Sequence, residues 1–574
     1  MSQAIRLEVE SAKGQQTILV GRGRPRLLTE ILRRERLPLN TRCGQRGLCD
    51  GCIIELLEGT LVKASTGEKV TTGSVRGCEY RLDDTPVRIR IPARSLLAYE
   101  PQAVSEFRLN VPRAHDPVWQ TVAAPITALK RRRPIRGLPA TTGYATMEYR
   151  DDHWLVTGVA AQPPARALGV AVDIGTTTVA VMLVDLADGK ILGRCADFNK
   201  QMHLGDDVAT RIGLCAADKT MLGQLQEAVV NQTIVPLLDA CLRQARADRA
   251  EVKAMAVAAN TTMLHLFAGV DPTPLGVYPF QPAFLNHRPL ELSALPGVSV
   301  HLLPSASAYI GADLTAGILA SGLAYDDGPS MLVDVGTNGE IILKNGHHLL
   351  GCATAAGPAF EGAGLTNGIR AGAGAVERIF LTSRPFAVQA RVIGDTKPIG
   401  ICGSAYVDLL AEGRRVGLLT PTGRFQNDGA GDWLRRHDDG LALRVARGQG
   451  NREILISETD VAHLLQSKAA IGAGILTLLE RAGLKPGDIQ RLYMAGGFGM
   501  HIDIPNAIAC GLLPGFEPRQ VQVVGNTSLA GAYLALLDCG ALDEIGRISQ
   551  RIEIVELNLD PQFESRYIDQ LSLP

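Results

Sequence analysis

Asp173-Ile-Gly-Thr-Thr-Thr178 and Asp334-Val-Gly-Thr-Asn-Gly339 are two copies of one short pattern, and together they decide the fold of this 574-residue chain. Each copy follows an apolar stretch and precedes a second apolar run, a turn and a third apolar run. The turns are Asp188-Gly189 and Asn345-Gly346, and both dipeptides are strong hairpin signals between apolar runs. The same hairpin therefore occurs twice, about 160 residues apart. Such a repeat predicts two similar half-domains that face one cleft.

Each Asp-x-Gly-Thr turn comes directly after an apolar strand. Small residues there let backbone N–H groups and hydroxyls approach phosphate oxygens, and an Asp at the strand end can hold Mg²⁺ or orient an attacking water. One copy alone would be an ordinary strand-end turn, whereas two matching copies favour a nucleotide site. We expect Asp173 and Asp334 to be catalytic. The expected nucleotide-binding residues beside them are Gly175, Thr176, Thr177, Thr178, Gly336, Thr337, Asn338 and Gly339.

Two later strands end in small polar or glycine-rich turns. Arg491-Leu-Tyr-Met-Ala-Gly-Gly-Phe-Gly499 suits the close passage of a nucleotide's sugar and base, so Gly496, Gly497 and Gly499 are expected to contact it. Val521-Gln-Val-Val-Gly-Asn-Thr-Ser528 leads into a helix, and Met255-Ala-Val-Ala-Ala-Asn-Thr-Thr262 has the same pattern earlier. The duplication is therefore expected to extend beyond the hairpins. The sequence has no Gly-x4-Gly-Lys-Ser/Thr phosphate loop and no Gly-x-Gly-x-x-Gly after the first strand.

Composition and charge exclude several classes of protein. The chain is 46% apolar and 20% charged with a formal net charge of −1, so an extended nucleic-acid surface is not expected. No uninterrupted apolar run approaches the ~20 residues of a membrane span, and the N-terminal residues lack the apolar stretch of a signal peptide. We therefore expect a cytoplasmic protein that binds neither nucleic acid nor membrane. The eleven cysteines are not a disulfide framework at this length.

Residues 1–94 are predicted to form a small β-rich domain. Alternating strands are expected at 5–9 and 16–20, a short amphipathic helix follows them, and a strand at 87–91 closes the sheet. Between these elements the segment Cys43-Gly-Gln-Arg-Gly-Leu-Cys49-Asp-Gly-Cys52 is followed by another strand and then by Cys78.

The spacing of these four cysteines is typical of an iron–sulfur cluster. Thiolates bind iron, and the glycines of the loop let backbone N–H groups turn toward the sulfurs. We therefore expect Cys43, Cys49, Cys52 and Cys78 to be the ligands. A zinc site is the alternative, although structural zinc usually shows two separated Cys-x-x-Cys pairs. The Cys-x5-Cys-x2-Cys spacing resembles adrenodoxin-like [2Fe–2S] ferredoxins, which have a β-grasp fold and carry one electron at a time.

Residues 95–166 are predicted to be a linker and a small middle domain. Lys130-Arg-Arg-Arg133 indicates a solvent-exposed linker, with a docking patch for an acidic partner as the alternative. Residues 144–149 and 154–156 are expected to form a hairpin. From 167 to 574 strands and helices alternate, which predicts an α/β fold.

The longest predicted helix covers about 458–482. Ser457 is its expected N-cap, Asp460 stands three residues on, and Gly483 ends it. Its apolar residues are spaced for a core-facing stripe, whereas Lys468 is expected on a solvated face.

Cys352-Ala-Thr-Ala-Ala-Gly-Pro-Ala-Phe-Glu-Gly-Ala-Gly364 consists almost entirely of small residues, and Gly357-Pro358 prevents a packed helix. Either a bulky group approaches the backbone there, or the segment is a tight structural loop. Cys352 and Cys402 are expected to be small core residues rather than ligands.

The twin hairpins and Ala495-Gly-Gly-Phe-Gly499 resemble the ASKHA superfamily of acetate and sugar kinases, heat-shock chaperones and actin. In that superfamily the two copies are the phosphate-1 and phosphate-2 motifs, and the late double glycine is the adenosine motif. Combined with an N-terminal ferredoxin and a small middle unit, the chain is similar to the reductive activators of corrinoid proteins. Four more stretches resemble signatures of that family, namely Asn260-Thr-Thr-Met-Leu-His-Leu266, Ser307-Ala-Tyr-Ile-Gly-Ala-Asp313, Ala356-Gly-Pro-Ala-Phe-Glu-Gly362 and Gly400-Ile-Cys-Gly-Ser404.

This resemblance implies a multidomain α/β protein with a β-grasp ferredoxin over 1–94, a middle unit over 95–166 and a two-lobed ASKHA domain over 167–574. It implies an ATPase coupled to electron transfer, which uses ATP, Mg²⁺ and a [2Fe–2S] cluster to return inactive Co(II) of a corrinoid methyltransferase protein to Co(I). The partners are then a corrinoid protein and an external low-potential electron donor, and a homodimer is expected. The loop 352–364 is the candidate surface against the corrin ring.

The alternative function is an ASKHA small-molecule kinase, or an ATPase with a fused ferredoxin redox module. A kinase would need a carboxylate base and a polar substrate pocket beside the terminal phosphate. A scaffold with a decayed nucleotide site is disfavoured by the intact Asp173, Thr176, Asp334 and Thr337. Activators of 2-hydroxyacyl-CoA dehydratases bridge one [4Fe–4S] cluster between two subunits and lack a ferredoxin domain, which this sequence is expected to have.

Overall fold

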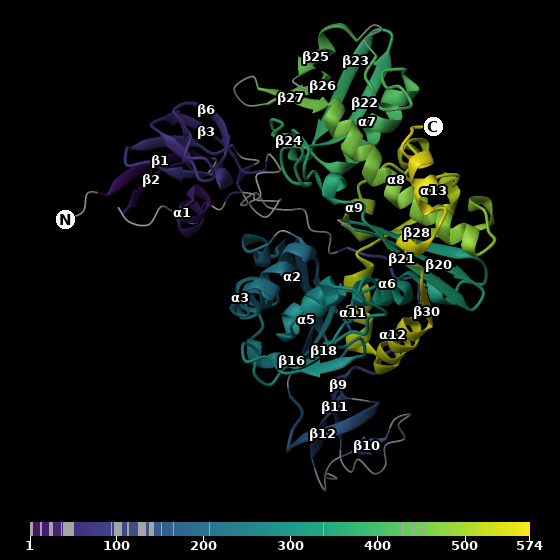
Figure 1. Cartoon of the computed structure of the whole chain (residues 1–574). Coiled ribbons are helices and arrows are strands. Elements are labelled where there is room, and N and C mark those ends of the chain that lie inside the picture. The colour runs from purple at the N-terminus through teal and green to yellow at the C-terminus, as the bar shows by residue number, and fades with distance from the viewer. Residues whose placement is uncertain are drawn as a thin grey trace.

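The computed structural model shows a small N-terminal sheet domain, a short sheet from residues 119–160, and a larger body that holds all later elements (Figure 1). It describes residues 4–11, 14–21, 27–35, 37, 39, 51–92, 95–96, 106–111, 114–123, 134–136, 143–150, 152–164, 166–205, 207–336, 338–426, 430–437, 440–448 and 452–574. Two expected cluster ligands, Cys43 and Cys49, lie outside the described residues, as do Thr337 and the basic stretch 130–133.

The N-terminal domain is a mixed five-stranded sheet in the order β2-β1-β8-β3-β6, with one helix packed on it. Alternate side chains of its first strand, Leu7 and Val9, are buried with Leu28 and Leu32 of the helix. The strand predicted to close the sheet instead lies between β1 and β3 and runs parallel to β1, so that expectation is wrong. The elements are β1 (Ile5–Ser11), β2 (Gly14–Val20), α1 (Leu28–Arg34), β3 (Ile53–Glu58), β4 (Leu61–Lys63), β5 (Lys69–Val70), β6 (Gly73–Arg76), β7 (Tyr80–Leu82) and β8 (Val87–Arg90).

A four-stranded sheet in the order β10-β12-β11-β9 forms the middle unit. Its strands are β9 (Trp119–Ala123), β10 (Ile135–Arg136), β11 (Tyr144–Arg150) and β12 (His153–Ala160). The hairpin predicted here is confirmed, because β11 and β12 pair antiparallel with Tyr149 opposite Trp154. The unit is fastened to the body through Asp116, whose N–H donates to the carbonyl of Leu537 at 2.8 Å and whose carbonyl accepts from Cys539 N–H at 3.0 Å.

Two six-stranded sheets that share the arrangement of five strands form the body, so the predicted repeat is confirmed. The first lobe holds the order β15-β14-β13-β16-β18-β17, and the second holds β29-β28-β19-β20-β21-β30. Each begins with a three-stranded antiparallel meander, and two further strands then add in parallel beside the first strand. The strands are β13 (Leu168–Ile174), β14 (Thr178–Asp185), β15 (Ile191–Phe198), β16 (Val252–Ala259), β17 (Arg288–Leu290), β18 (Ser299–Leu302), β19 (Ser330–Val335), β20 (Gly339–Asn345), β21 (His348–Thr354), β28 (Arg491–Ala495), β29 (Val521–Gly525) and β30 (Ile552–Ile554).

The duplication extends beyond the hairpins, but with a different pairing from the one the sequence suggested. Strand β16 lies next to β13, and its counterpart next to β19 is β28, not β29. The stretch 255–262 therefore corresponds to 491–499, and 521–528 corresponds to the strand and turn that lead to Asp313. The two stretches have similar sequences because Asn260 and Asn526 each cap a helix with the side chain, not because their strands hold the same place in the two sheets.

The sheets bury both faces, as the continuous apolar runs predict. In β19, Met331 and Val333 belong to the core of the second lobe, whereas Leu332 between them packs into the core of the first lobe. Helices α6 (Ala312–Ser321) and α11 (Thr527–Leu537) lie between the two sheets (Figure 1). Because α11 comes from the C-terminal part of the chain, the two lobes share one core.

The remaining helices cover the outer faces or belong to an insertion in the second lobe. The first lobe carries α2 (Val208–Ala217), α3 (Thr220–Val229), α4 (Val235–Ala245) and α5 (Thr261–Ala268), with a π-turn at Val230–Ile234 between α3 and α4. The insertion consists of β22 (Ala375–Ser383), β23 (Phe386–Val392), β24 (Gly400–Ile401), α7 (Gly403–Arg415), β25 (Leu434–His437), β26 (Gly440–Arg447) and β27 (Glu453–Ser457). Later helices are α9 (Gly496–Gly499), α10 (Ile504–Ala509), α12 (Cys539–Arg551) and α13 (Phe563–Gln570).

Helix α8 (Glu458–Arg481) follows the predicted start and end. Ser457 and Asp460 form the capping box, and Gly483 adopts a left-handed φ of +68°. The expectation for Lys468 is wrong, because its side chain is buried and its Nζ donates to the Ser572 carbonyl at 2.9 Å. Burial lowers the pKa of this ammonium group. Among the described helices α8 alone is long and apolar enough to cross a membrane, but 78% of that stretch is buried inside the fold.

Candidate nucleotide site

A cavity of about 280 Å³ lies where the turns of the two lobes meet. Ten of the predicted residues line it, namely Asp173, Gly175, Thr176, Thr177, Thr178, Asp334, Gly336, Asn338, Gly496 and Gly497. Gly339 and Gly499 are not in the lining. A Cβ on Gly339 would lie 2.6 Å from Thr354 Oγ1, and one on Gly499 would lie 2.6 Å from Met494 Cγ, so both glycines serve packing behind the cavity.

The first Asp-x-Gly-Thr turn is held from behind through its backbone carbonyls. Asn199 Nδ2 donates to the Gly175 carbonyl at 2.9 Å, and Asn199 N–H donates to the Thr177 carbonyl at 2.8 Å. The buried Arg211 donates from Nη2 to the Thr176 carbonyl at 2.6 Å. A trans peptide points its N–H opposite to its C=O, so these bonds turn the N–H groups of 176–178 toward the cavity. Such an array of N–H groups attracts anions.

Asp173 at the end of β13 is fixed by the C-terminal part of the chain. Asn526 Nδ2 donates to one carboxylate oxygen at 2.8 Å, and Ser528 Oγ donates to the other at 2.7 Å. Burial raises the pKa of this carboxyl, and the two hydrogen bonds oppose the rise. The first aspartate is therefore pre-oriented by a turn more than 350 residues later.

Asp334 at the end of β19 lies against the late double glycine. Gly496 has a φ of +81°, and a Cβ there would stand 2.3 Å from Asp334 Oδ1. The strands explain this approach, because Asp334 is paired with Ala495 in the parallel β19–β28 ladder. Only glycine fits the position, both for the left-handed backbone and for the space.

Two further carboxylates, Asp313 and Glu340, join the aspartates in the lining. Burial and the neighbouring Asp334 raise the pKa of Asp313 to about 7. Burial and Asp173 raise the pKa of Asp334 to about 7, and burial with Asp313 and Asp334 raises that of Glu340 well above its usual range. Mutual repulsion of this kind is relieved by a divalent cation, so the donor set fits Mg²⁺, which prefers oxygen ligands.

The opposite wall is made by the insertion and the loop that follows β21. Phe360, in the turn Pro358–Glu361, lies with its ring 5.3 Å from that of Phe498. A Cβ on Gly403 would lie 1.8 Å from the Phe360 carbonyl, so the start of α7 presses directly on this loop. In the small-residue segment, Gly362 is required for a tight turn, since a Cβ there would lie 2.6 Å from Ile369 N. The tight-loop interpretation thus explains part of 352–364, and corrin contact stays a prediction.

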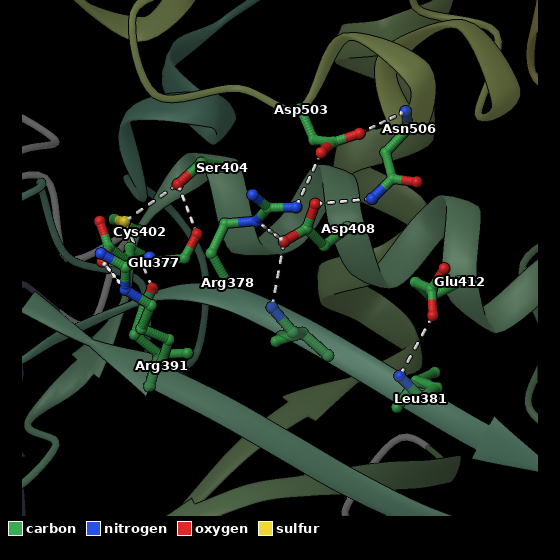
Figure 2. A network of polar contacts seen from close by, with 12 residues as sticks. Glu377, Arg378, Leu381, Arg391, Cys402, Ser404, Asp408, Glu412, Asp503 and Asn506 are labelled. Atoms are coloured by element: carbon green, nitrogen blue, oxygen red, sulfur yellow. Dashed lines mark hydrogen bonds and ion pairs between the residues drawn. The ribbon is translucent and has the colours of Figure 1, made fainter.

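A polar network anchors this wall to the segment after the double glycine (Figure 2). The buried Asp408 of α7 accepts from Arg378 Nε at 2.7 Å and from Asn506 Nδ2 at 2.8 Å. Arg378 Nη2 also donates to Asp503, the N-cap of α10, at 2.8 Å. Ser404, which lines the cavity, donates to the Glu377 carbonyl at 2.8 Å in the same network. The network therefore ties α7 and β22 to the start of α10, which follows the glycine turn in the chain.

The cysteines agree with the sequence where they are described. Cys352 and Cys402 are buried, as expected of core residues, and Cys402 also lines the cavity. Cys52 and Cys78 are buried as well, and Gly77 N–H donates to the Cys52 carbonyl at 2.9 Å. Two cysteines far apart in sequence are thus neighbours, which fits ligands of one cluster. Within the described residues no three His, Cys, Asp or Glu side chains are grouped closely enough to hold a metal ion by themselves, so a cation among the carboxylates of the cavity would need phosphate or water oxygens to complete its coordination.

Sequence reasoning missed several residues that build the cavity. Four of them lie inside stretches already named from the sequence: Asp313, Asn260, Glu361 and Asn526. Their polar side chains, placed after a strand or before a helix, could have indicated that they line the cavity. Asn199 and Arg211 had no such signal, because they act on the turn from behind and stand in unremarkable sequence.

Comparison with known proteins shows the family. Residues 328–574 match the model of the C-terminal ASKHA domain of RACo, and 168–326 match the RACo middle region. The corrinoid activation enzyme RamQ of Eubacterium limosum is 30% identical, over 94% of this chain and 95% of that protein. The chain belongs to the RACo family. A RACo-family relative in Methanosarcina barkeri, the [Co(II) methylated amine-specific corrinoid protein] reductase, is 26% identical over 70% of this chain and 76% of its own length.

A solved RACo-type structure has the same architecture. The reductive activator for corrinoid, iron-sulfur protein is 30% identical, and the match covers 99% of this chain and 98% of that one with a TM-score of 0.73. The multidomain α/β fold with an ASKHA domain is therefore confirmed. The border between the two RACo-family models, at 326–328, falls between the first and second lobes described above.

Proposed function

We propose that this protein binds MgATP in the cavity between its lobes and passes one electron through a [2Fe–2S] cluster to the cobalt of a corrinoid protein. As a RACo-family member it is an enzyme of reductive activation, and relatives named for that activity match nearly its whole length. The observation that carries the nucleotide half is the pair of Asp-x-Gly-Thr turns, which face one cavity from two lobes. The full-length match disfavours the small-molecule kinase alternative.

The residues have distinct roles in this proposal. Asp173 and Asp334, with Asp313 and Glu340, would hold Mg²⁺ directly or through water and place the attacking water. The N–H groups of 176–178 would bind phosphate oxygens, and the Gly496-Gly497 turn would admit the nucleoside. Hydrolysis is then controlled by whether the two lobes present both aspartates to the same phosphate.

Four cysteines would hold the cluster, which supplies a one-electron carrier: Cys43, Cys49, Cys52 and Cys78. Burial of Cys52 and Cys78 excludes water from that side. Plant-type centres lie near −400 mV, and Co(II) bound to protein is expected to be harder to reduce. Each 100 mV uphill costs about 2.3 kcal/mol per electron. ATP would supply this free energy by binding one conformation of the protein more tightly than another. The core residues that join the two lobes can couple these conformations.

The remaining partners are part of the proposal. An external low-potential donor reduces the cluster, a homodimer is the expected assembly, and the cytoplasm is the expected location. The loop 352–364 stays the candidate corrin surface. Ala355, Pro358 and Gly364 are its exposed residues, while Phe360 and Glu361 turn inward to the cavity. The partner would therefore contact the same short loop whose inward-facing residues line the nucleotide cavity.

An anaerobic assay tests the proposal. The purified protein is mixed with a Co(II) corrinoid protein, a reductant and MgATP, and the Co(I) absorption band is followed. We expect the band to depend on ATP and to disappear in Asp173→Asn and Asp334→Asn variants whose visible cluster spectrum is unchanged. A band of equal size without ATP would contradict the coupling, and a colourless zinc-containing protein would contradict the electron-transfer half.

A further inference from the structure

Among the cavity-lining residues that the structure describes, Arg370 is the one Arg or Lys. Five carboxylates share the lining, namely Asp173, Asp313, Asp334, Glu340 and Glu361. Nucleotide phosphates would bring further negative charge into this space. A divalent cation compensates the carboxylates at the strand ends, but a phosphate oxygen that points away from the cation still needs a donor. Arg370 is placed to be that donor.

Arg370 reaches from the second lobe to the first. Its Nη2 donates to Thr177 Oγ1 in the first Asp-x-Gly-Thr turn at 3.2 Å, and its guanidinium lies 5.4 Å from the ring centre of Phe198 at the end of β15. Thr177 Oγ1 in turn donates to Glu361 Oε2 at 3.3 Å. Arg370, Thr177 and Glu361 therefore form a triangle across the mouth of the cavity, with one corner on the first lobe.

The ion pair in this triangle is a weak one. Arg370 Nη2 and Glu361 Oε2 are 3.6 Å apart, beyond normal hydrogen-bond length, and the two side chains remain 13% and 21% exposed. A charge-assisted hydrogen bond between a guanidinium and an anion is about 2.7–2.9 Å long, so this contact is not one of them. A terminal phosphate carries more charge and three acceptor oxygens, and two of these can accept from the planar guanidinium fork in shorter, stronger bonds. Phosphate would thus compete successfully with Glu361 for the same cation.

We propose that Arg370 is the residue by which this protein distinguishes ATP from ADP. When the terminal phosphate lies at the first Asp-x-Gly-Thr turn, the Arg370 guanidinium leaves Glu361 and binds the phosphate while it keeps its hydrogen bond to Thr177. Loss of that phosphate by hydrolysis returns Arg370 to Glu361. Because Glu361 belongs to the loop 352–364, the candidate corrin surface, and Arg370 follows this loop in the chain, the exchange gives the loop two positions. The inference rests on the proposed binding of MgATP in this cavity.

Calorimetric titration with ADP and with a non-hydrolysable ATP analogue, both with Mg²⁺, tests the proposal. Arg370→Met keeps an apolar stem against Phe198 and removes the charge. We expect it to weaken the ATP analogue about tenfold or more, the range for a charge-assisted hydrogen bond, while the affinity for ADP changes less than about threefold. Arg370→Lys keeps the charge without the planar fork and should give an intermediate loss.

Glu361→Gln provides a test of opposite sign. Removing the competing carboxylate should raise the affinity for the ATP analogue relative to ADP. Arg391→Met is the matched control, since this arginine is 71% exposed and neither it nor its partner Glu377 lines the cavity, so the affinity for both nucleotides should stay unchanged. Equal losses of both nucleotides in Arg370→Met, or no loss at all, would overturn the proposal. A wild-type protein that binds neither nucleotide would overturn the assignment of the cavity itself.

Discussion

Gly496 shows how a single backbone position fixes the chemistry of the cavity. A Cβ at this position would stand 2.3 Å from Asp334 Oδ1, at a φ of +81° that L side chains rarely adopt. We expect Gly496→Ala to displace the Asp334 carboxylate and to lower ATPase activity at least tenfold. Gly487→Ala is the control, because nothing lies within 4 Å of a Cβ there. Full activity in Gly496→Ala would show that the carboxylate's position does not matter. Phosphate release in steady state is the measurement.

His265 in α5 is held in one neutral tautomer. Its Nδ1 lies 2.7 Å from the Thr261 carbonyl, so it carries the proton, and its Nε2 accepts from Ala283 N–H at 3.0 Å. A second proton would have to enter at Nε2 and break the bond to Ala283. Burial lowers the pKa of His265, and burial with His287 lowers that of the buried His301 much further.

These two histidines predict a loss of stability in acid. A depressed folded-state pKa means that the unfolded chain binds the proton more readily, so stability is present above pH ~6.5 and falls as the pH drops below it. The raised pKa values of Asp313, Asp334 and Glu340 act in the opposite direction over the same pH range, so the contribution of a histidine is measured as a difference between wild type and a variant that lacks it. His265→Asn keeps a donor for Thr261 but no longer titrates, so urea unfolding at pH 7, 6 and 5 should show its stability rising relative to that of the wild type as the pH falls. An identical slope in the variant would contradict the assignment.

At the scale of elements, the network around Asp408 joins α7, β22 and α10 beneath the glycine turn (Figure 2). Arg378→Met would leave the Asp408 carboxylate, which is 0% exposed, without its charged partner. We expect a loss of about 3 kcal/mol in unfolding free energy and weaker nucleotide binding, because Arg378 would no longer tie Asp503, the N-cap of α10, to β22. Arg391→Met, which removes an exposed arginine, should cost less than about 0.5 kcal/mol. Similar losses in the two variants would contradict the role of the network.

The sequence predicted elements wherever local pattern and burial agree. Both hairpins and the helix capped by Ser457 appear as expected. Lys468 was assigned to solvent because charged residues seldom lie inside, but its ammonium finds a carbonyl at Ser572, a partner more than 100 residues away. The roles of Asn199 and Arg211 could not be predicted from the sequence for the same reason, since only the folded chain shows which carbonyls they bind.

At the scale of the whole molecule, the two lobes are not independent units. Helix α11 belongs by sequence to the second half of the chain but lies in the core of the first lobe, and the Asn526 turn that begins it holds Asp173. The linker that follows the N-terminal domain reaches the same turn. The Glu106 carbonyl accepts from Asn526 N–H at 3.0 Å, and Arg108 N–H donates to the Val524 carbonyl at 3.0 Å. The backbone of this linker and the Asp173 carboxylate therefore both form hydrogen bonds with Asn526.

Phe107 packs this linker against the first lobe through its side chain. Its ring centre lies 5.9 Å from that of Tyr533 in α11, and the guanidinium of Arg194 lies 5.5 Å above it. We expect Phe107→Ala to cost about 2 kcal/mol, less than a fully buried phenylalanine, and to slow ATP-dependent cobalt reduction several-fold. The cluster spectrum should be unchanged. The reason is that the linker would no longer move together with the Asn526 turn when nucleotide binding changes the conformation of the cavity.

The control for the linker is Tyr278→Ala, an aromatic residue that is 81% exposed in the first lobe. Two rates separate coupling from binding: ATP hydrolysis without the corrinoid partner, and cobalt reduction with it. Phe107→Ala should keep the rate of ATP hydrolysis, because Asn526 retains its side-chain bond to Asp173, and should slow cobalt reduction several-fold. If both rates fall together, the linker merely stabilises the lobe. If neither falls, the electron reaches the partner without mechanical help from the nucleotide cavity, and ATP must act on the partner alone.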